Sequence, residues 1–350
     1  MSEKQYTLTQ LGWKTFFNQQ LTLEDLEQSA PYRVTQVYRN RLTVLGENGE
    51  LNLNLAQYSN LQESTVGDWL LISKIQTETP VILDRLSIFQ RKSPGTNTSQ
   101  LIAANVDTAF IVSSCNHDFN LSRIERYLAL AKEAQVDAVL VLTKADLINE
   151  EQRQSYLAQL HQLQAHLVVL MLNALDSEDV QQLNDWCKVG QTVVLLGSSG
   201  VGKTTLSNSL CALQEATAAI RDDDSKGRHT TTGRSLYFTH AGGLILDCPG
   251  MRELQLTDCE EGVRAVFSDI ELIAKQCKFN NCQHQSEPGC EVLKALEAGT
   301  LDPRRLTNYQ KILKEQARNS LTLAQSHQQD RAFGKFIKNS LKEKKSRLDR

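Results

Sequence analysis

The sequence contains little proline, methionine or tryptophan, with 6 Pro, 3 Met and 3 Trp in 350 residues. It also lacks a recognisable signal peptide and an apolar run long enough to cross a bilayer, so we expect a cytoplasmic protein with no membrane partner. Five of its cysteines are scattered singly, which argues against a disulfide framework. With 40% hydrophobic content, the chain is long enough to form two or three compact units.

A glycine-rich loop is the most informative feature that is present. Residues 197–204 read Gly-Ser-Ser-Gly-Val-Gly-Lys-Thr and match the phosphate-binding pattern G-x-x-x-x-G-K-S/T. The apolar run 192–196 predicts a buried strand before the loop, and residues 205–213 predict a helix after it. A ligand-free turn between a strand and a helix is the alternative interpretation.

Each part of this pattern has a chemical reason. Successive backbone N–H groups converge on phosphate oxygens at a helix N-terminus, the lysine neutralises the β- and γ-phosphate charge, and the following hydroxyl can ligate Mg²⁺. We therefore expect Lys203 to act in catalysis and Thr204 to bind Mg²⁺. The predicted phosphate-binding residues are Gly197, Ser198, Ser199, Gly200, Val201, Gly202, Lys203, Thr204 and Thr205.

A second motif lies upstream of this loop. Thr143-Lys144-Ala145-Asp146 follows the apolar run 139–142 and is close to the N-K-x-D element that reads guanine. A carboxylate at Asp146 can accept hydrogen bonds from the N1–H and the exocyclic amine of guanine, whereas adenine presents no such donor pair. The stem of Lys144 can cover the base. Thr143 replaces the usual bracing amide by a shorter hydroxyl, which bears on nucleotide affinity. A helix N-cap with Asp146 near its first turn is the alternative interpretation.

Two further elements come after the glycine-rich loop. Asp247-Cys248-Pro249-Gly250 is a D-x-x-G element, in which Asp247 is expected in the Mg²⁺ shell and the Gly250 N–H at the γ-phosphate. The next residue is Met251, whose thioether cannot orient an attacking water as a glutamine would. In the polar segment 226–233, His229 is the candidate for that catalytic role, and one of Thr230–Thr232 is expected to complete the Mg²⁺ shell.

The order of these motifs is unusual. The guanine-reading motif comes first, followed by the phosphate-binding loop, the polar segment 226–233 in the place of the first switch loop, and the D-x-x-G element. An ordinary GTPase starts at the phosphate-binding loop. Parallel strands pack identically whichever connection is cut, provided that the old ends lie close together. We therefore predict a central α/β P-loop GTPase domain at 91–262 with a circularly permuted motif order. The chain leaves this domain soon after Gly250, so movement of that switch would act directly on the C-terminal part of the chain.

The C-terminal part contains a cluster of metal-ligand residues with the spacing C-x4-C-x-H-x5-C. Its members are Cys277, Cys282, His284 and Cys290. Four such ligands in a short stretch suit a closed tetrahedral zinc site, and the absence of an open position favours a structural role. We predict one Zn²⁺ per chain in a helical C-terminal domain at 263–350.

Together these features resemble one family, the bacterial circularly permuted GTPases known as ribosome small subunit-dependent GTPase A. The permuted order, Gly-Arg-His-Thr-Thr-Thr at 227–232, the D-x-x-G element with a hydrophobic residue after it, and the zinc spacing carry the resemblance. Thr143 and Asn173-Ala174 depart from the family pattern. The resemblance implies an N-terminal OB-fold, GTP hydrolysis with Mg²⁺, binding of GTP and GDP, and a late role in maturation of the small ribosomal subunit through its rRNA.

The sequence of the N-terminal part predicts a small barrel independently of the family resemblance. Short apolar alternations separated by turn signals fit an antiparallel OB-like barrel at 33–90, which either holds RNA or serves as a spacer. Residues 1–32 are expected to form a flexible extension, and 91–99 a linker. A short helix within that extension is expected to carry on one face Trp13, Phe16, Phe17 and Leu21.

The charge is distributed unevenly. The formal net charge is −3, yet residues 301–350 contain thirteen Lys or Arg against five Asp or Glu. Such an end favours a polyanionic partner such as RNA. The resemblance implies that this partner is the rRNA of the small subunit and that the subunit stimulates hydrolysis. We also expect a monomeric protein. An amphipathic helix packed on its own domain would explain the same residues. An ATP-using P-loop enzyme and a nucleotide-gated RNA-binding protein with little catalytic role are the alternative functions.

Overall fold

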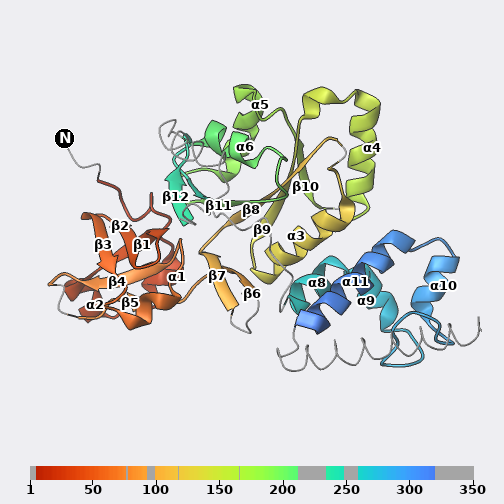
Figure 1. Cartoon of the computed structure of the whole chain (residues 1–350), viewed down its shortest axis with the longest axis horizontal. Coiled ribbons are helices and arrows are strands. Elements are labelled where there is room, and N and C mark those ends of the chain that lie inside the picture. The colour runs from red at the N-terminus through yellow and green to blue at the C-terminus, as the bar shows by residue number, and fades with distance from the viewer. Residues whose placement is uncertain are drawn as a thin grey trace, which may run out of the picture.

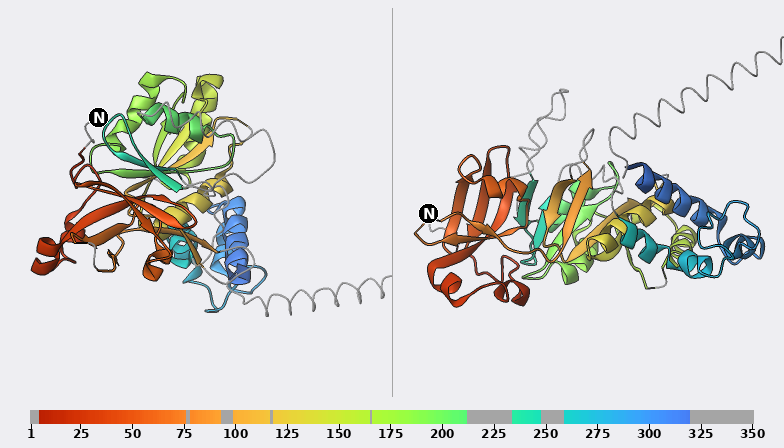
Figure 2. Two further views of the ribbon diagram at one scale, coloured as in Figure 1. Left: turned by 60° about the vertical axis from the view of Figure 1, so that its left-hand side comes forward. Right: turned by 90° about the horizontal axis from the view of Figure 1, so that it is seen from below.

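The structure, a computed structural model, places three parts one after another along the long axis of the chain (Figure 1). A barrel lies at one end, a mostly parallel sheet with helices lies in the middle, and a group of helices lies at the other end (Figure 2). This is the predicted multidomain architecture. The described residues are 5–75, 78–92, 99–116, 118–164, 166–211, 234–247 and 259–319.

The N-terminal barrel consists of short antiparallel strands around an apolar core. Its strands are β1 (Ser29–Val37), β2 (Arg41–Gly46), β3 (Gly49–Asn54), β4 (Trp69–Ser73) and β5 (Val81–Ile82), with a 3₁₀ turn η1 (Ser59–Glu63) before β4. β1 pairs with β2 on one side and with β4 on the other, while β3 extends β2 and β5 extends β4. Val34, Leu42, Val44 and Leu70 are fully buried inside. This pairing is that of a partly open OB-like barrel, as predicted.

The N-terminal segment packs on this barrel, in contrast to the flexible extension that we expected. It contains α1 (Thr15–Asn18) and α2 (Leu23–Gln28). Leu11 and Phe17 are fully buried against Trp69, and the Trp13 ring lies edge-on to the Trp69 ring at 4.7 Å. Burial of these large side chains offsets the entropy lost in ordering the segment. Helical spacing identified the correct residues, although the helix itself is short.

The central sheet has the permuted order that the motifs predict. Its strands are β8 (Thr108–Ser114), β9 (Asp137–Thr143), β10 (Val168–Met171), β11 (Thr192–Leu196), β12 (Arg234–Phe238) and β13 (Leu244–Asp247). They lie in the order β10-β9-β8-β11-β13-β12, and all are parallel except β12. The strand before the glycine-rich loop, β11, is therefore central in the sheet although it is fourth among these strands in the chain.

Helices cover both faces of this sheet. α3 (Leu121–Glu133) and α4 (Glu150–His161) cover one face, while α5 (Ser177–Gln181), the 3₁₀ turn η3 (Gln182–Trp186) and α6 (Lys203–Leu210) cover the other. Alternate residues of each strand point to opposite faces of the sheet. Ile111 of β8 therefore packs in the core on the side of α3, and Phe110 packs in the core on the side of α6. Strands buried on both faces explain the continuous apolar runs in the sequence.

Two connections join the barrel to the central sheet. β6 (Ile88–Lys92) and β7 (Ser99–Ala104) form a hairpin in which Lys92 pairs with Ser99, so both ends of the segment expected as a linker are strand. In addition, β1 pairs antiparallel with β12 through Gln36 and Ser235, which makes one 11-stranded sheet. Backbone hydrogen bonds hold the ends of the segment 91–99 in strands. Its turn-forming residues alone had predicted a linker.

The first and the last of the described C-terminal helices pack against α3. The described C-terminal helices are α8 (Glu260–Val266), α9 (Ser268–Ala274), α10 (Glu291–Glu297) and α11 (Pro303–Asn319). The Gly262 N–H donates to Glu133 Oε2 at 2.7 Å, and any Cβ at Gly262 would collide with the Ala129 carbonyl oxygen. α8 therefore approaches α3 closely. The part of the basic end 301–350 that follows residue 319 lies outside the described residues.

A fully buried arginine lies where the barrel meets the central sheet. Arg33 donates to the carbonyl oxygens of Leu11 (2.5 Å), Gly67 (3.3 Å) and Asn105 (2.9 Å) and to the Thr192 hydroxyl (2.9 Å). Burial lowers its pKa to about 10, so it is charged at neutral pH. One side chain thus joins the N-terminal segment, the barrel, the turn after β7 and the start of β11.

We predict that Arg33→Met lowers the free energy of unfolding by at least about 3 kcal/mol, because each buried acceptor left without a donor costs about 1–3 kcal/mol. Denaturant titration followed by fluorescence measures this change. Arg41→Met is the matched control, since Arg41 is exposed on β2 and stacks on Tyr38. Equal loss in both variants would contradict a special role for Arg33.

Candidate nucleotide and metal sites

The glycine-rich loop connects β11 to α6, as its pattern requires. Gly197 has φ 151° and Gly202, the residue before α6, has φ 93°. A Cβ at Gly197 would collide with the Val112 carbonyl oxygen of the neighbouring strand β8. Only glycine fits there, because the backbone approaches β8 closely and adopts a positive φ.

The lysine of the loop turns back over it. Lys203 Nζ donates to the Gly197 carbonyl oxygen at 2.7 Å and to the Ser198 carbonyl oxygen. The ammonium is therefore already positioned above the loop that would surround phosphate groups. The loop residues predicted to bind phosphate are brought together, with Thr204 exposed in the first turn of α6.

The base-reading motif lies next to this loop. β9 ends at Thr143, and Lys144, with φ 60°, leads into the 3₁₀ turn η2 (Ala145–Leu147). Thr143 is buried and its hydroxyl donates to the Val201 carbonyl oxygen at 2.6 Å, while Lys144 Nζ donates to the Gly200 carbonyl oxygen at 3.1 Å. The hydroxyl thus provides a brace to the phosphate loop although the usual amide is absent. Asp146 is exposed beside this junction, so its carboxylate is accessible to a base.

A third segment completes the surroundings of the loop. After β10, the Asn173 N–H donates to Asp179 Oδ2 at 2.8 Å, and the Ala174 carbonyl oxygen accepts from the Ser209 hydroxyl of α6 at 3.0 Å. Leu175, the next residue, is 83% exposed. The segment that follows β10 therefore lies beside α6, the helix that begins at the phosphate loop.

Part of the predicted site lies outside the described residues. His229, Thr230–Thr232, Gly250 and Met251 belong to this part, and their roles stay predictions. Asp247 is the last residue of β13, which pairs directly with the phosphate-loop strand β11.

Sequence reasoning missed one group of residues beside the loop. Arg123 of α3 forms an ion pair with Asp118 at 2.7 Å and donates to the Ser198 hydroxyl, and Tyr127 of the same helix lies near Ser198. These residues belong to no nucleotide-binding motif. One sequence signal could have indicated them, namely an arginine in the first turn of the helix that follows β8. The C-terminal end of β8 lies beside the phosphate loop because β8 and β11 are parallel neighbours.

The four predicted metal ligands converge at the C-terminal end of the molecule. The candidate ligand atoms of Cys277, Cys282, His284 and Cys290 all lie within 4.8 Å of one another. The Cys277 and Cys290 sulfur atoms are 3.9 Å apart, and His284 Nδ1 lies 3.3 Å from the Cys290 sulfur. A tetrahedral Zn²⁺ with Zn–S distances of about 2.3 Å requires sulfur atoms about 3.8 Å apart, so this geometry fits one zinc ion.

The surrounding loop favours metal ligation. Burial lowers the pKa of His284, despite the nearby Glu287 and Glu271, and favours the neutral imidazole that a metal requires. The Glu287 carboxylate accepts backbone hydrogen bonds from Gln283, Gln285 and Ser286, which holds the loop. The other cysteines that the structure describes are buried, as expected: Cys115, Cys187, Cys211 and Cys259.

Among the described residues, no helix combines the length and apolar character needed to cross a lipid bilayer. Two solved structures share the fold of this chain. The crystal structure of YjeQ from Thermotoga maritima has a TM-score of 0.60 and 23% identity, and covers 82% of this chain and 98% of that protein. YloQ, described as a circularly permuted GTPase, has a TM-score of 0.58 and 24% identity over 82% of this chain and 94% of that protein.

Sequence comparison gives nearer relatives. A protein of Vibrio parahaemolyticus named small ribosomal subunit biogenesis GTPase RsgA 2 is 51% identical over 97% of this chain and 94% of its own length. A Mesorhizobium japonicum protein named small ribosomal subunit biogenesis GTPase RsgA is 45% identical over 90% of this chain and 91% of its own length. The family model described as RsgA GTPase matches residues 82–257. With relatives this similar along nearly its whole length, the chain belongs to the RsgA GTPase family.

Proposed function

We propose that this protein hydrolyses GTP to GDP and phosphate and acts late in assembly of the small ribosomal subunit, where it binds rRNA and is stimulated by the subunit. The observation that carries the proposal is the junction of the phosphate loop and the guanine-reading motif through the Thr143–Val201 hydrogen bond. The names of the relatives agree with this function. We further propose that the protein acts in the cytoplasm as a monomer.

The residues divide the chemistry of hydrolysis among them. Asp146 accepts hydrogen bonds from guanine, and Lys203 neutralises charge at the transferring phosphate. Thr204 and Asp247 would hold Mg²⁺, which would stabilise the negative charge of the phosphates. His229 positions the attacking water, because Met251 has no group that can do so.

We also propose that the cluster of Cys277, Cys282, His284 and Cys290 binds one structural zinc ion. All four positions are protein ligands, so no open position remains for a substrate. A bound zinc would fix the loop between α9 and α10, which has few apolar residues of its own with which to form a core.

The first test of the proposed function is GTP hydrolysis with and without purified small ribosomal subunits. Slow hydrolysis alone and strong stimulation by subunits are expected, since the partner would order the loop around His229. His229→Ala should reduce the stimulated rate about 100-fold and leave GTP affinity nearly unchanged, as for a group that acts in the transition state. Lys203→Ala should abolish hydrolysis.

The matched control for this test is His240→Ala, because His240 is an exposed histidine of the same domain. Equal hydrolysis with and without subunits would overturn the ribosome-dependent function. Full stimulation of His229→Ala would move the water-positioning role to another group. Equal turnover of ATP and GTP would favour an ATP-using enzyme.

A second prediction concerns base recognition. Asp146→Asn should weaken GTP binding and favour xanthosine triphosphate, because the new amide offers a donor where xanthine offers a carbonyl and guanine offers another donor. Competition binding with the two nucleotides measures the preference. Asp185→Asn serves as control, since Asp185 is 75% exposed and pairs with Lys188. An unchanged preference in Asp146→Asn would remove Asp146 from the base pocket.

A third prediction concerns zinc. Cys282→Ala should lower the zinc content below one ion per chain and loosen the C-terminal helices, because a structural zinc site contributes on the order of 10 kcal/mol to folding in small peptides. Metal analysis and limited proteolysis measure the two effects. Cys259→Ala, which removes a buried thiol outside the cluster, should keep its zinc. Full occupancy in Cys282→Ala would refute this ligand set.

A further inference from the structure

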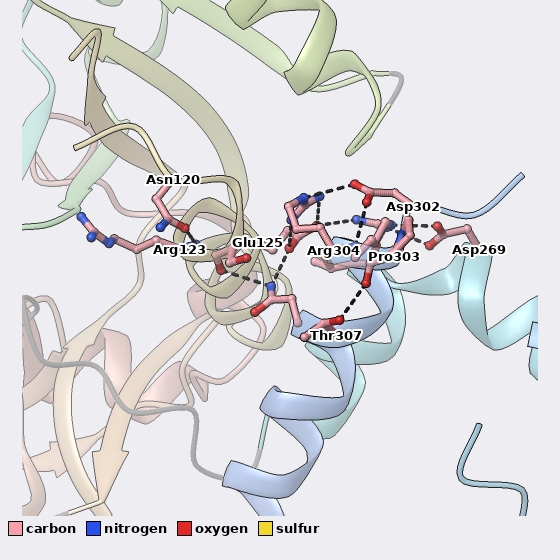
Figure 3. A network of polar contacts seen from close by, with 12 residues as sticks. Asn120, Arg123, Glu125, Asp269, Asp302, Pro303, Arg304 and Thr307 are labelled. Atoms are coloured by element: carbon pink, nitrogen blue, oxygen red, sulfur yellow. Dashed lines mark hydrogen bonds and ion pairs between the residues drawn. The ribbon is translucent and has the colours of Figure 1, made fainter. Parts of the chain in front are cut away.

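The start of α3 is built to hold an arginine against the phosphate loop. The Asn120 side chain caps the helix by accepting from the Arg123 N–H at 3.0 Å. Asp118 then pairs with the Arg123 guanidinium at 2.7 Å, and the same nitrogen donates to the Ser198 hydroxyl. Figure 3 shows the Arg123 side chain pointing away from Glu125, which forms an ion pair with Arg305 of α11. The two sides of α3 therefore have different partners.

A second residue of the same helix lies near Ser198. Tyr127 lies one turn after Arg123, is 8% exposed and has Ser198 among the neighbours that affect its pKa. The Ser198 carbonyl oxygen, in turn, accepts from Lys203 Nζ. Ser198 is thus held by α3 through its side chain and contacts the phosphate-binding lysine through its backbone.

The helix that holds Ser198 is itself anchored. Glu125 is fully buried, and its carboxylate accepts from Arg304 (3.0 Å), Arg305 (2.8 Å) and Asn308 of α11 (Figure 3). Arg305 also pairs with Asp269 of α9 at 2.8 Å. A buried carboxylate that loses one of these partners is costly, so α3 cannot shift along α11 without penalty. It is a rigid base from which a side chain can position a loop.

We propose that Arg123, held by Asp118, is a positioning residue of the phosphate site that fixes the loop through the Ser198 hydroxyl. This inference rests on the proposed GTP binding. The loop must hold one conformation to present its N–H groups to the phosphates, and a prepared loop loses less entropy when nucleotide binds. The phosphates shared by GDP and GTP benefit alike, so Arg123 acts on the affinity for both nucleotides.

The test compares equilibrium binding of a fluorescent GDP analogue and of GTP by the full chain and three variants. Arg123→Met and Ser198→Ala should each weaken both nucleotides about tenfold, which equals about 1.4 kcal/mol. The double variant should be no weaker than either single variant by more than about twofold, because the two residues act through one contact. In Arg123→Met the affinity should fall more than the rate at saturating GTP, since Arg123 acts on the binding of nucleotide and not on the reacting phosphate.

Arg126→Met is the matched control. Arg126 lies on the same helix and pairs with Glu315 of α11 at 2.6 Å, so the variant removes the same charge and a comparable contact. Its nucleotide affinity should stay within about twofold of the wild type, as expected for a partly exposed ion pair. Thermal melting of every variant separates loss of the fold from loss of binding.

Three results would overturn the inference. The first is a loss of affinity of about 100-fold in the double variant, the product of two independent tenfold losses. The second is a loss of affinity in Arg123→Met that Ser198→Ala does not reproduce. The third is a lowered rate at saturating GTP with unchanged affinity, which would mean that Arg123 contacts the reacting phosphate. Wild-type affinity for GTP tests the proposed function separately, because the inference depends only on the ratios between variants.

Discussion

The buried carboxylate of Glu125 is the constraint on which the arrangement of the functional site depends. Removing a carboxylate from water costs several kcal/mol, so its oxygens need strong donors. Arg304, Arg305 and Asn308 of α11 provide them. Arg305 then needs its own acceptors and finds them in Asp269 and the Val266 carbonyl oxygen. One buried charge therefore fixes α3, α9 and α11 relative to one another.

The phosphate loop of the candidate nucleotide site is held from two directions. From α3, Arg123 donates to the Ser198 hydroxyl of the phosphate loop. From the end of β9, Thr143 and Lys144 contact the carbonyl oxygens of Val201 and Gly200. Circular permutation changes none of these contacts, because they depend on which strands are neighbours and not on where the chain begins.

Local patterns predicted the parts of the site that depend on local chemistry. The strand expected at 192–196 is β11 with the same bounds, and the four ligands chosen by spacing converge. Both features combine a residue pattern with a geometry set by nearby chain. The permuted sheet was also predictable, because motif order is a property of the sequence.

Long-range contacts account for the features that the sequence did not reveal. The contact of Arg123 with Ser198 joins residues far apart in the chain, and no spacing rule indicates it. The segment of Trp13 and Phe17 is polar enough to suggest flexibility, yet its aromatic side chains pack on Trp69. Thr143 departs from the usual motif, and only the structure shows that its hydroxyl reaches Val201.

The position of Arg33 between the barrel and the central sheet has a consequence for how the chain can be divided into fragments. Among its acceptors, the Gly67 carbonyl oxygen belongs to the barrel, while the Asn105 carbonyl oxygen and the Thr192 hydroxyl belong to the central part. A barrel cut out as a fragment would expose β1 along the edge where Gln36 meets Ser235 and would leave the guanidinium short of partners. The barrel and the GTPase part are therefore joined by backbone pairing and by Arg33, and a fragment ending between them would expose a strand edge prone to edge-to-edge association.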